Sequence, residues 1–333
     1  SLYELVMKMI RKENKYFIFD REKNICLKSF CKYIYFVFLS FFFKIFLYVF
    51  RPRFIPKKYN VSVCAIFKNE APYLREWIEF NHLIGIDHFF LYNNNSNDDF
   101  LLVLKPYIKK GLVTLVDWPF NQKQMECYID CIQKYSDETK WLGFIDLDEF
   151  IVPKSTNSIY DFLKKFEKTR SAVKIYWRLF GTSGKLDRQS GLVVEDFIVC
   201  WDKYCDIGKC FYNTAYSFNS NSFHKNNLHH SFWACLKEID IPPVNCFDHI
   251  CIGDRNVADL CDFPIQINHY FTKSYIEYAQ KKSKGDVYFL NNPHDEKYFF
   301  EHEMKCISVD YSAFKYLIKL KKLMLDKDNN NQH

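Results

Sequence analysis

Two carboxylates separated by one residue are the feature of this sequence with the clearest chemistry. Asp146 and Asp148 follow the apolar run of residues 141–145, which predicts a buried strand that ends at the pair. At the exit of a strand, two acidic side chains can converge on one hard cation such as Mg²⁺ or Mn²⁺, which prefers oxygen ligands. A cation held there could stabilise a departing nucleotide diphosphate. Asp-x-Asp also occurs in solvated turns, so its meaning depends on the surrounding elements.

Those elements predict an α/β fold with a mainly parallel sheet flanked by helices. Three segments with helical spacing separate four apolar runs that indicate strands, at residues 61–67, 86–92, 112–116 and 141–146. Such alternation implies right-handed βαβ units, whose ligands bind at the carboxyl ends of the strands. The polar loops at residues 68–70 and 93–98 should therefore face the acidic pair.

Composition narrows the class of ligand. The chain has 333 residues, 19% of them aromatic, with only 9 glycines, as expected for a globular protein with a large core. A net charge of +6 without a recognisable module does not favour a nucleic-acid partner. The loop after the first strand lacks G-x-G-x-x-G, and no G-x-x-x-x-G-K-[ST] occurs, so neither a dinucleotide site nor a P-loop is expected.

The thirteen cysteines are scattered without any C-x-x-C pair. Cys200, Cys205 and Cys210 recur every five residues, a wider spacing than zinc sites commonly use. We expect free thiols in a reducing compartment rather than a zinc cluster.

Further motifs follow in a definite order along the chain, from the first polar loop to the last helices. They are Lys68-Asn69-Glu70, Tyr73-Leu74, Glu76-Trp77-Ile78, Tyr92-Asn93-Asn94, Ser96, Asp98, Gln124, residues 145–150, Trp177, Phe180-Gly181, Glu195, Phe197, Asn268-His269-Tyr270, Lys273-Ser274, Lys281 and Gly285. In this order and spacing they resemble glycosyltransferase family 92 over roughly residues 61–325. The resemblance implies a GT-A fold and transfer from a nucleotide sugar. The family pattern leads us to expect Asp after Tyr92, but this chain has Asn93 there. This departure weakens the case for a second-strand carboxylate that contacts the base or ribose.

The resemblance also implies site roles. Asp146 and Asp148 would bind Mn²⁺ at the diphosphate of a UDP-sugar, and His269 would complete the metal shell, although a lone histidine is more often a core residue. Glu70 could accept hydrogen bonds from ribose hydroxyls or simply complement a helix dipole. Further donor contacts are expected from Lys68, Asn69, Asn94, Ser96 and Asp98, and from Lys273, Lys281 and Lys284 near the diphosphate.

An inverting transfer needs a base to take the proton of the acceptor hydroxyl. Glu195 and Asp196, in a valine-rich run beyond the acidic pair, are the candidates, and Glu149 is the other, better suited to orienting a neighbour. An acceptor sugar could stack on Trp177, Trp201 or Trp233, for each of which core packing is the alternative.

Residues 30–50 form an apolar stretch interrupted by Lys32, Ser40 and Lys44. It could span a bilayer or lie in the membrane interface, followed by basic residues 51–58. We expect an N-terminal membrane-associated region at 1–58, a catalytic domain at 59–325 and a polar tail at 326–333. Within the domain, 61–150 would bind the donor and 151–325 the acceptor. We expect this domain on the cytosolic face, with a single-pass protein placing it on the far side as the alternative.

The sequence thus predicts a metal-dependent hexosyltransferase, with galactose as the expected sugar, acting on a glycan or glycolipid with inversion. One alternative is an Asp-nucleophile phosphatase, disfavoured because Glu149-Phe150 follow the pair. Another is a non-catalytic carbohydrate-binding or membrane scaffold protein.

Overall fold

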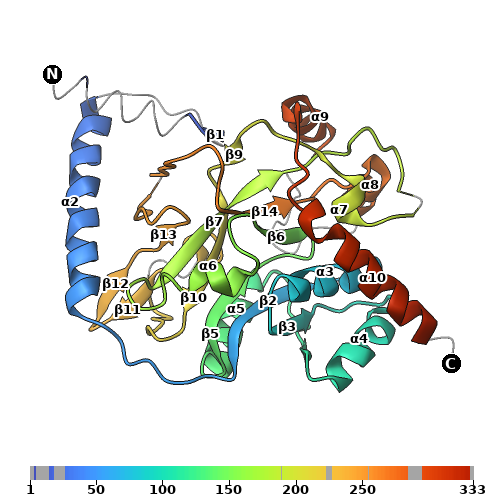
Figure 1. The fold of residues 1–333 in the computed structure, drawn as a ribbon, viewed down its shortest axis with the longest axis horizontal. Coiled ribbons are helices and arrows are strands. Elements are labelled where there is room, and N and C mark those ends of the chain that lie inside the picture. Colours follow the sequence, from blue (N-terminus) through green and yellow to red (C-terminus); the bar gives the residue numbers. More distant parts are fainter. Residues whose placement is uncertain are drawn as a thin grey trace.

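The fold comes from a computed structural model that describes residues 4, 15–18, 27–188, 190–222, 227–253, 255–283 and 295–330. The predictions for Lys284 and Gly285 lie outside the described residues. The described part is a mixed α/β structure around one nine-stranded sheet (Figure 1). Along the sheet the strands run in the order β4-β3-β2-β5-β10-β7-β14-β6, and β13 pairs with β7.

The first half of the sheet confirms the predicted parallel unit. Its strands are β2 (Tyr59–Phe67), β3 (His88–Asn93), β4 (Val113–Asp117) and β5 (Thr139–Phe144), and all three pairings among them are parallel. The three predicted helices connect them as α3 (Ala71–Leu83), α4 (Phe100–Lys109) and α5 (Gln124–Tyr135). Gly85, with φ +100°, follows α3, where this conformation favours a residue without Cβ.

The strand order reverses between β2 and β5. The chain runs from β2 to β3 and β4 in one direction, then returns to place β5 on the other side of β2. With right-handed connections, this order puts α3 and α4 on one face of the sheet and α5 on the other. A crevice opens where such an order reverses, outside the carboxyl ends of the two strands. The acidic pair leaves the sheet at that point, directly after β5.

The second half of the sheet is mixed, so the prediction of a mainly parallel sheet is wrong there. The strand β10 (Gly208–Asn213) pairs antiparallel with both β5 and β7 (Ala172–Leu179). Next, β14 (Ile265–His269) runs parallel to β7 and antiparallel to β6 (Glu149–Pro153), and the short β13 (Val244–Asn245) is parallel to β7. A single sheet therefore crosses the expected boundary between donor and acceptor halves.

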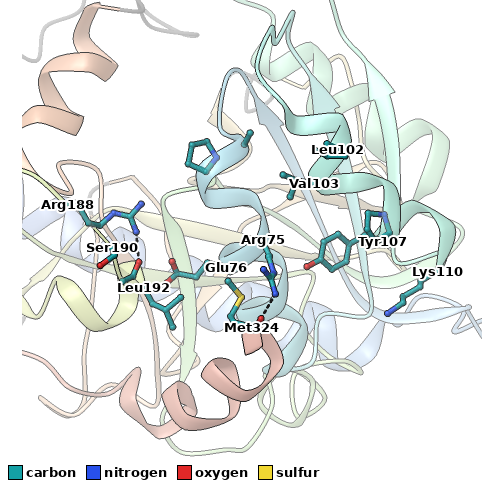
Figure 2. A pocket seen from close by; sticks show the side chains of 14 residues that line it. Arg75, Glu76, Leu102, Val103, Tyr107, Lys110, Arg188, Ser190, Leu192 and Met324 are labelled. Atoms are coloured by element: carbon teal, nitrogen blue, oxygen red, sulfur yellow. Dashed lines mark hydrogen bonds between the residues drawn. The ribbon is translucent and has the colours of Figure 1, made fainter. Parts of the chain in front are cut away.

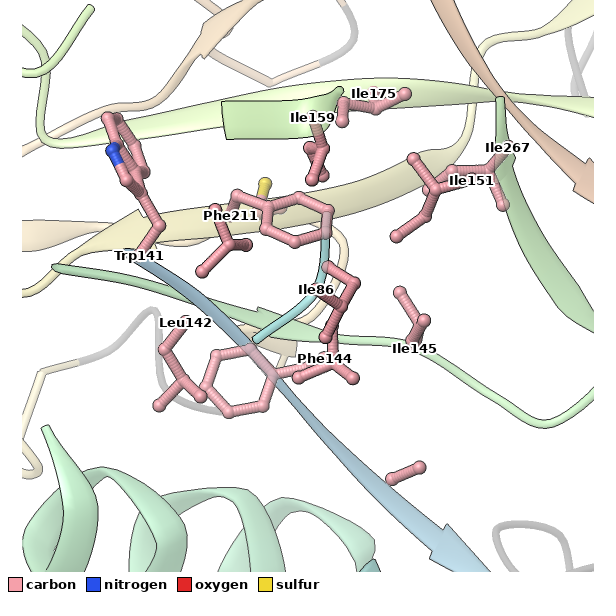
Figure 3. Close-up of a cluster of buried hydrophobic side chains, with 14 of the residues drawn as sticks. Ile86, Trp141, Leu142, Phe144, Ile145, Ile151, Ile159, Ile175, Phe211 and Ile267 are labelled. Atoms are coloured by element: carbon pink, nitrogen blue, oxygen red, sulfur yellow. The ribbon is translucent and has the colours of Figure 1, made fainter. Parts of the chain in front are cut away.

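The core lies on both sides of this sheet, and Figure 3 shows part of it around Trp141, Phe144 and Phe211. Gly143 of β5 faces Phe211 of β10, and a Cβ on Gly143 would come within 2.3 Å of the Phe211 ring. Glycine therefore lets the two strands pair with the ring between them. Because side chains alternate along a strand, Lys209 lies on the same face of β10 as Phe211.

The remaining elements are short strands and helices around the sheet. They are β1 (Phe17–Ile18), α6 (Ile159–Leu163), α7 (Val193–Asp196), β8 (Val199–Cys200), β9 (Tyr204–Cys205), β11 (Ala234–Leu236), β12 (Ile239–Ile241), α8 (Tyr275–Ser283), α9 (Glu296–Lys305), β15 (Ser308–Val309) and α10 (Phe314–Asn330). The last helix, α10, packs beside α3 (Figure 1). All twelve cysteines in the described part are free thiols.

The apolar N-terminal segment forms α2 (Leu27–Val49), which stands along one edge of the molecule (Figure 1). One face of α2 packs on the domain through the buried side chains of Tyr33, Phe43, Phe46 and Leu47. Among the residues that the structure describes, no helix combines the length and apolarity needed to cross a bilayer.

Candidate active site

The turn between β5 and β6 holds the acidic pair in a fixed shape. Glu149 closes this turn, because its Oε2 accepts a hydrogen bond from the backbone N–H of Asp146 at 3.0 Å. From α3, Trp77 Nε1 donates to the carbonyls of Asp146 and Glu149, at 3.1 and 2.8 Å. Burial raises the pKa of the Glu149 carboxyl well above its usual range. These contacts let Glu149 position the turn, and its role as a base stays a prediction.

Each carboxylate of the pair has its own ammonium partner. Lys209 Nζ lies 2.7 Å from Asp146 Oδ2, and Lys281 Nζ lies 2.6 Å from Asp148 Oδ2. Lys209 is fully buried on β10 and also lies 3.6 Å from Glu149 Oε2. Burial alone would lower its pKa, but Asp146 and Glu149 outweigh burial and raise it. Lys281, on α8, keeps half of its side chain exposed.

His269 faces the pair from the neighbouring strand. In the register of β14 with β6, His269 lies opposite Glu149, which places its Nε2 3.5 Å from Asp148 Oδ1. Burial would raise the pKa of Asp148, but Lys281 and His269 outweigh it and hold that pKa well below its usual range. The imidazole also packs on Trp177, with ring centres 4.5 Å apart. The fold therefore brings together Asp148 and His269, as predicted.

The donor set of Asp146, Asp148 and His269 suits a hard divalent cation, because Mn²⁺ accepts carboxylate oxygens and imidazole nitrogen. Asp146 keeps about a third of its side chain exposed, while Asp148 is nearly buried. Gln124 Nε2 and the Tyr128 hydroxyl lie 3.3 and 3.4 Å from Asp146 Oδ1. The residues fit the ion in kind, although both carboxylates are engaged by lysine in this arrangement.

A second group of potential ligands lies at the C-terminal end of α9. The group consists of His302, Glu303 and Cys306, whose potential ligand atoms all lie within 4.8 Å of one another. Its ligand atoms are already used, because His302 Nδ1 accepts from Trp201 and its Nε2 lies 3.0 Å from the Phe180 carbonyl. Glu303 accepts from Thr182. This group fastens α9 to the domain.

The two predicted donor loops meet at the carboxyl edge of the sheet. The Ser96 hydroxyl accepts from the backbone N–H of Asn69 at 2.9 Å, and Asp98 Oδ2 accepts from that of Ala71 at 2.8 Å. Asn94 Nδ2 donates to the carbonyls of Trp118 and Phe120, at 2.7 and 2.9 Å. The side chains of Ser96, Asp98 and Asn94 therefore fix the loops themselves.

The same contacts change the expected role of Asn69. Asn69 is a residue type that commonly caps a helix and precedes α3, but it adopts φ +56° and its Oδ1 accepts from the N–H of Asn97. The first turn of α3 is capped instead by Asp98, from the next loop. Glu70 occupies the N-cap position without a side-chain cap bond, and Lys68 is exposed. Contact of Lys68, Asn69 or Glu70 with a nucleotide stays a prediction.

Lys273 enters the site from the turn between β14 and α8. It adopts φ +48°, a strained conformation for a side chain of this size, and is nearly buried. Its Nζ lies 4.2 Å from the centre of the Tyr73 ring. Burial lowers the pKa of Lys273, against the attraction of Glu70 and Asp148. The turn thus places a third ammonium group, after Lys209 and Lys281, near the acidic pair.

A carboxylate that the sequence did not single out holds this region together. Glu277, in the first turn of α8, accepts from the Tyr73 hydroxyl at 2.6 Å, from Ser274 Oγ at 2.7 Å and from Arg188 Nε at 3.2 Å. The S-x-x-E spacing of Ser274 and Glu277 is a capping box, which was the available signal. Because Lys281 lies one turn further along α8, Glu277 orients the helix that carries it.

The candidate bases lie in α7, tied to other elements. Glu195 pairs with Lys321 of α10, and Asp196 pairs with Lys185 at 2.9 Å. These ion pairs join α7 to its neighbours rather than to the acidic pair. Of the three tryptophans proposed to stack on an acceptor, Trp177 lies at the site and Trp201 is buried against His302.

A cavity of about 700 Å³ lies between α3, α4, α10 and the loop before α7, and the acidic pair does not line it (Figure 2). Arg75, Tyr107 and Arg188 line it, and Arg75 donates to the carbonyl of Met324. Ala71 and Pro72, just after the first donor loop, form part of its wall.

Comparison with known proteins decides the family to which this arrangement belongs. The family model of glycosyltransferase family 92 matches residues 57–234, more than half of the chain. The chain belongs to glycosyltransferase family 92. The matched part contains the acidic pair, both donor loops and Lys209.

Curated relatives of this family 92 chain align over shorter stretches. Glycosyltransferase family 92 protein Os08g0121900 of Oryza sativa subsp. japonica is 32% identical over 132 residues, covering 39% of this chain and 23% of that protein. Beta-1,4-galactosyltransferase galt-1 of Caenorhabditis elegans is 34% identical over 109 residues, covering 28% and 26%. The chain thus spans about a quarter of the length of these relatives.

Solved structures give weaker likenesses to the family 92 chain. TarS 1–349 of S. aureus covers 47% of each chain with a TM-score of 0.32 and 13% identity. Glucosyl-3-phosphoglycerate synthase of Mycobacterium tuberculosis, solved with Mn²⁺, UDP and glucosyl-3-phosphoglycerate, covers 36% of this chain and 44% of its own, with a TM-score of 0.26 and 20% identity. These scores are low, so membership of the family rests on the sequence match.

Proposed function

We propose that this chain transfers galactose from UDP-galactose to a hydroxyl of a glycan or glycolipid, with inversion. Membership of family 92 supports the class of reaction. The sugar is supported by relatives named as galactosyltransferases, among them galactan beta-1,4-galactosyltransferase GALS3 of Arabidopsis thaliana, 31% identical over 129 residues. The observation that carries the proposal is the position of Asp148, which meets His269 and Lys281 at the carboxyl edge of the sheet.

Asp146, Asp148 and His269 would hold a divalent cation, with Mn²⁺ as the expected ion. When bound, such an ion neutralises the charge that develops on the departing diphosphate. Lys281, which pairs with Asp148 at 2.6 Å, would contribute positive charge to the binding of the phosphates. Lys273 would add a second positive charge close by.

The two donor loops would receive the nucleotide. We propose that Glu70 accepts hydrogen bonds from ribose hydroxyls, beside Lys68 and Asn69. Asn94, Ser96 and Asp98 would act mainly by fixing the loop conformation, since their polar atoms bond the loops' own backbone. Preorganised loops bind more tightly because less freedom is lost on binding.

The acceptor hydroxyl must lose a proton as the anomeric carbon is attacked. Glu195 and Asp196 remain the proposed bases, and Glu195 is the more exposed of the two. To act, either carboxylate would have to leave its lysine partner. A Glu195→Gln variant that keeps donor binding but loses turnover would support this role.

Binding of UDP and Mn²⁺ tests the proposal without requiring the acceptor. Thermal shift should show that UDP stabilises the chain when Mn²⁺ is present, because a ligand bound to the folded state alone raises its stability. Asp148→Asn and Asp146→Asn should each abolish this shift and the Mn²⁺ binding followed by electron paramagnetic resonance. Asp262→Asn, at an exposed position where the carboxylate pairs with Lys154, is the matched control and should change neither.

Binding of Mn²⁺ and UDP by Asp148→Asn at wild-type strength would refute the metal assignment. A wild-type chain that binds glycan but neither UDP nor Mn²⁺ would instead identify a carbohydrate-binding or scaffold protein.

A further inference from the structure

The helix α2 has two apolar faces, and only one of them is covered within the described structure. Tyr33, Phe43, Phe46 and Leu47 are buried against the domain. On the opposite face, large side chains recur at spacings of three and four residues and therefore form one stripe along the helix. They are Ile34, Val37, Phe38, Phe41, Phe42, Ile45, Tyr48 and Val49, with exposed fractions between 43% and 70%.

The stripe continues beyond the end of the helix. Phe54 and Ile55 follow it with exposed fractions of 42% and 60%. Single exposed apolar side chains are normal on proteins, but a contiguous run of this length marks an interaction surface. The aromatic content also matters, because such rings favour the boundary between lipid headgroups and acyl chains.

The charge around the stripe indicates what covers it. Residues 27–58 contain seven lysines and arginines and no aspartate or glutamate. Arg51, Arg53 and Lys58 are exposed, and the Arg51 guanidinium lies 5.5 Å from the centre of the Tyr48 ring. Positive charge therefore borders the apolar stripe directly. An anionic surface complements it, whereas a second copy of the chain would bring the same positive charges together.

We propose that α2 docks this protein on an anionic lipid bilayer, with the stripe immersed in the interface and the following basic residues on the headgroups. Basic residues near such a membrane surface each strengthen binding, and apolar burial adds to it. This surface is independent of the acidic pair, so it goes beyond the proposed transferase function.

The packing of α2 indicates that the helix lies on the membrane rather than spanning it. Its inner face touches the domain through Lys44, 3.8 Å from Asp248, and through Ser40 Oγ, which accepts from Arg255 at 3.3 Å. A spanning helix would lose these contacts together with the burial of Phe46 and Leu47. It would also place the Lys44 ammonium within hydrocarbon.

Flotation of the full chain with lipid vesicles tests the proposal. The wild type should float with vesicles that contain phosphatidylserine and far less with phosphatidylcholine alone, and salt should weaken the difference. Phe38→Ser combined with Phe41→Ser should abolish flotation. Arg51→Gln, Arg53→Gln and Lys58→Gln together should weaken binding to phosphatidylserine vesicles by roughly 100-fold, given the effect per basic residue.

Leu102→Ser combined with Ile318→Ser is the matched control, because these side chains are equally exposed on α4 and α10 and should leave flotation unchanged. Three results would overturn the proposal. One is a wild type that floats with neither kind of vesicle. Another is a dimer in light scattering without vesicles that Phe38→Ser and Phe41→Ser convert to a monomer. The third is bound protein that alkaline carbonate fails to release, as expected for a spanning helix.

Discussion

At the scale of single residues, Lys209 is the group on which the acidic turn depends. It is fully buried between Asp146 and Glu149, at 2.7 and 3.6 Å. Two carboxylates and one ammonium share this region, so removal of the ammonium leaves Asp146 and Glu149 without the positive partner that they share. Breaking a buried ion pair in this way costs about 3–5 kcal/mol.

We therefore expect Lys209→Met to lower the free energy of unfolding by about 3–5 kcal/mol in urea denaturation. Lys123→Met is the control, since Lys123 pairs with Glu126 at 2.7 Å where both side chains are half exposed. Exposed pairs contribute at most about 1 kcal/mol. A loss from Lys209→Met no larger than the control would mean that water or another cation reaches the turn.

The residues of the site differ in how far the sequence predicts them. Asp146, Asp148 and His269 stand in motifs at strand ends, and the structure brings Asp148 and His269 together. Lys209 stands in the unremarkable strand sequence Gly-Lys-Cys-Phe-Tyr, and its role depends on a contact 63 residues away. Local patterns do not encode such a contact, so it appears only once the strands are paired.

At the scale of elements, Glu76 joins α3 to the start of α7. Its carboxylate accepts from the backbone N–H groups of Val193 and Val194, at 2.8 and 3.1 Å. Burial raises its pKa to about 7 despite these two bonds. The folded state therefore binds the Glu76 proton more tightly than the unfolded state, and this contribution to stability is present below pH 4.5 and is lost as the pH rises to about 7.

Glu76→Gln removes this titration. The difference in the free energy of unfolding, variant minus wild type, should rise by about 3 kcal/mol from about pH 4.5 to pH 8. This rise is the equivalent of the pKa shift of Glu76. Urea denaturation at both pH values measures the change. Glu296→Gln, at an exposed position in α9, should stay within about 0.5 kcal/mol of the wild type at both. A variant that loses stability relative to the wild type at high pH would show that the two hydrogen bonds outweigh burial.

Caps show why elements are predicted better than the contacts that fix them. Hydrophobic spacing located α3, α4 and α5 correctly. The cap of α3, however, comes from Asp98, 27 residues after the backbone group it binds, while the adjacent Asn69 serves another loop. A polar residue at the right local position is only one of several that the fold can bring to a helix end.

At the scale of the whole molecule, the order of strands in the second half of the sheet was beyond prediction. Parallel βαβ units follow from alternating strands and helices, so β2 to β5 could be inferred. The strand β10 instead inserts antiparallel between β5 and β7, and β14 pairs with β6 across more than one hundred residues. Such non-local pairings depend on complementary surfaces, like Gly143 against Phe211, rather than on local periodicity.

The relation of α2 to the rest of the molecule gives the last prediction. Leu47 is 1% exposed and belongs to the same core cluster as the central strands, whereas Phe38 on the same helix is 67% exposed. If α2 is part of the folded domain, Leu47→Ala should lower the free energy of unfolding by about 2–5 kcal/mol, the cost of truncating a buried leucine. Phe38→Ala should change it by less than about 0.5 kcal/mol, as for a surface substitution. Because both residues occupy one helix, a difference in helix propensity cannot account for such a contrast. If Leu47→Ala and Phe38→Ala have equally small effects on the free energy of unfolding without lipid, α2 does not pack as part of the domain. The membrane alone would then have to hold the helix in place.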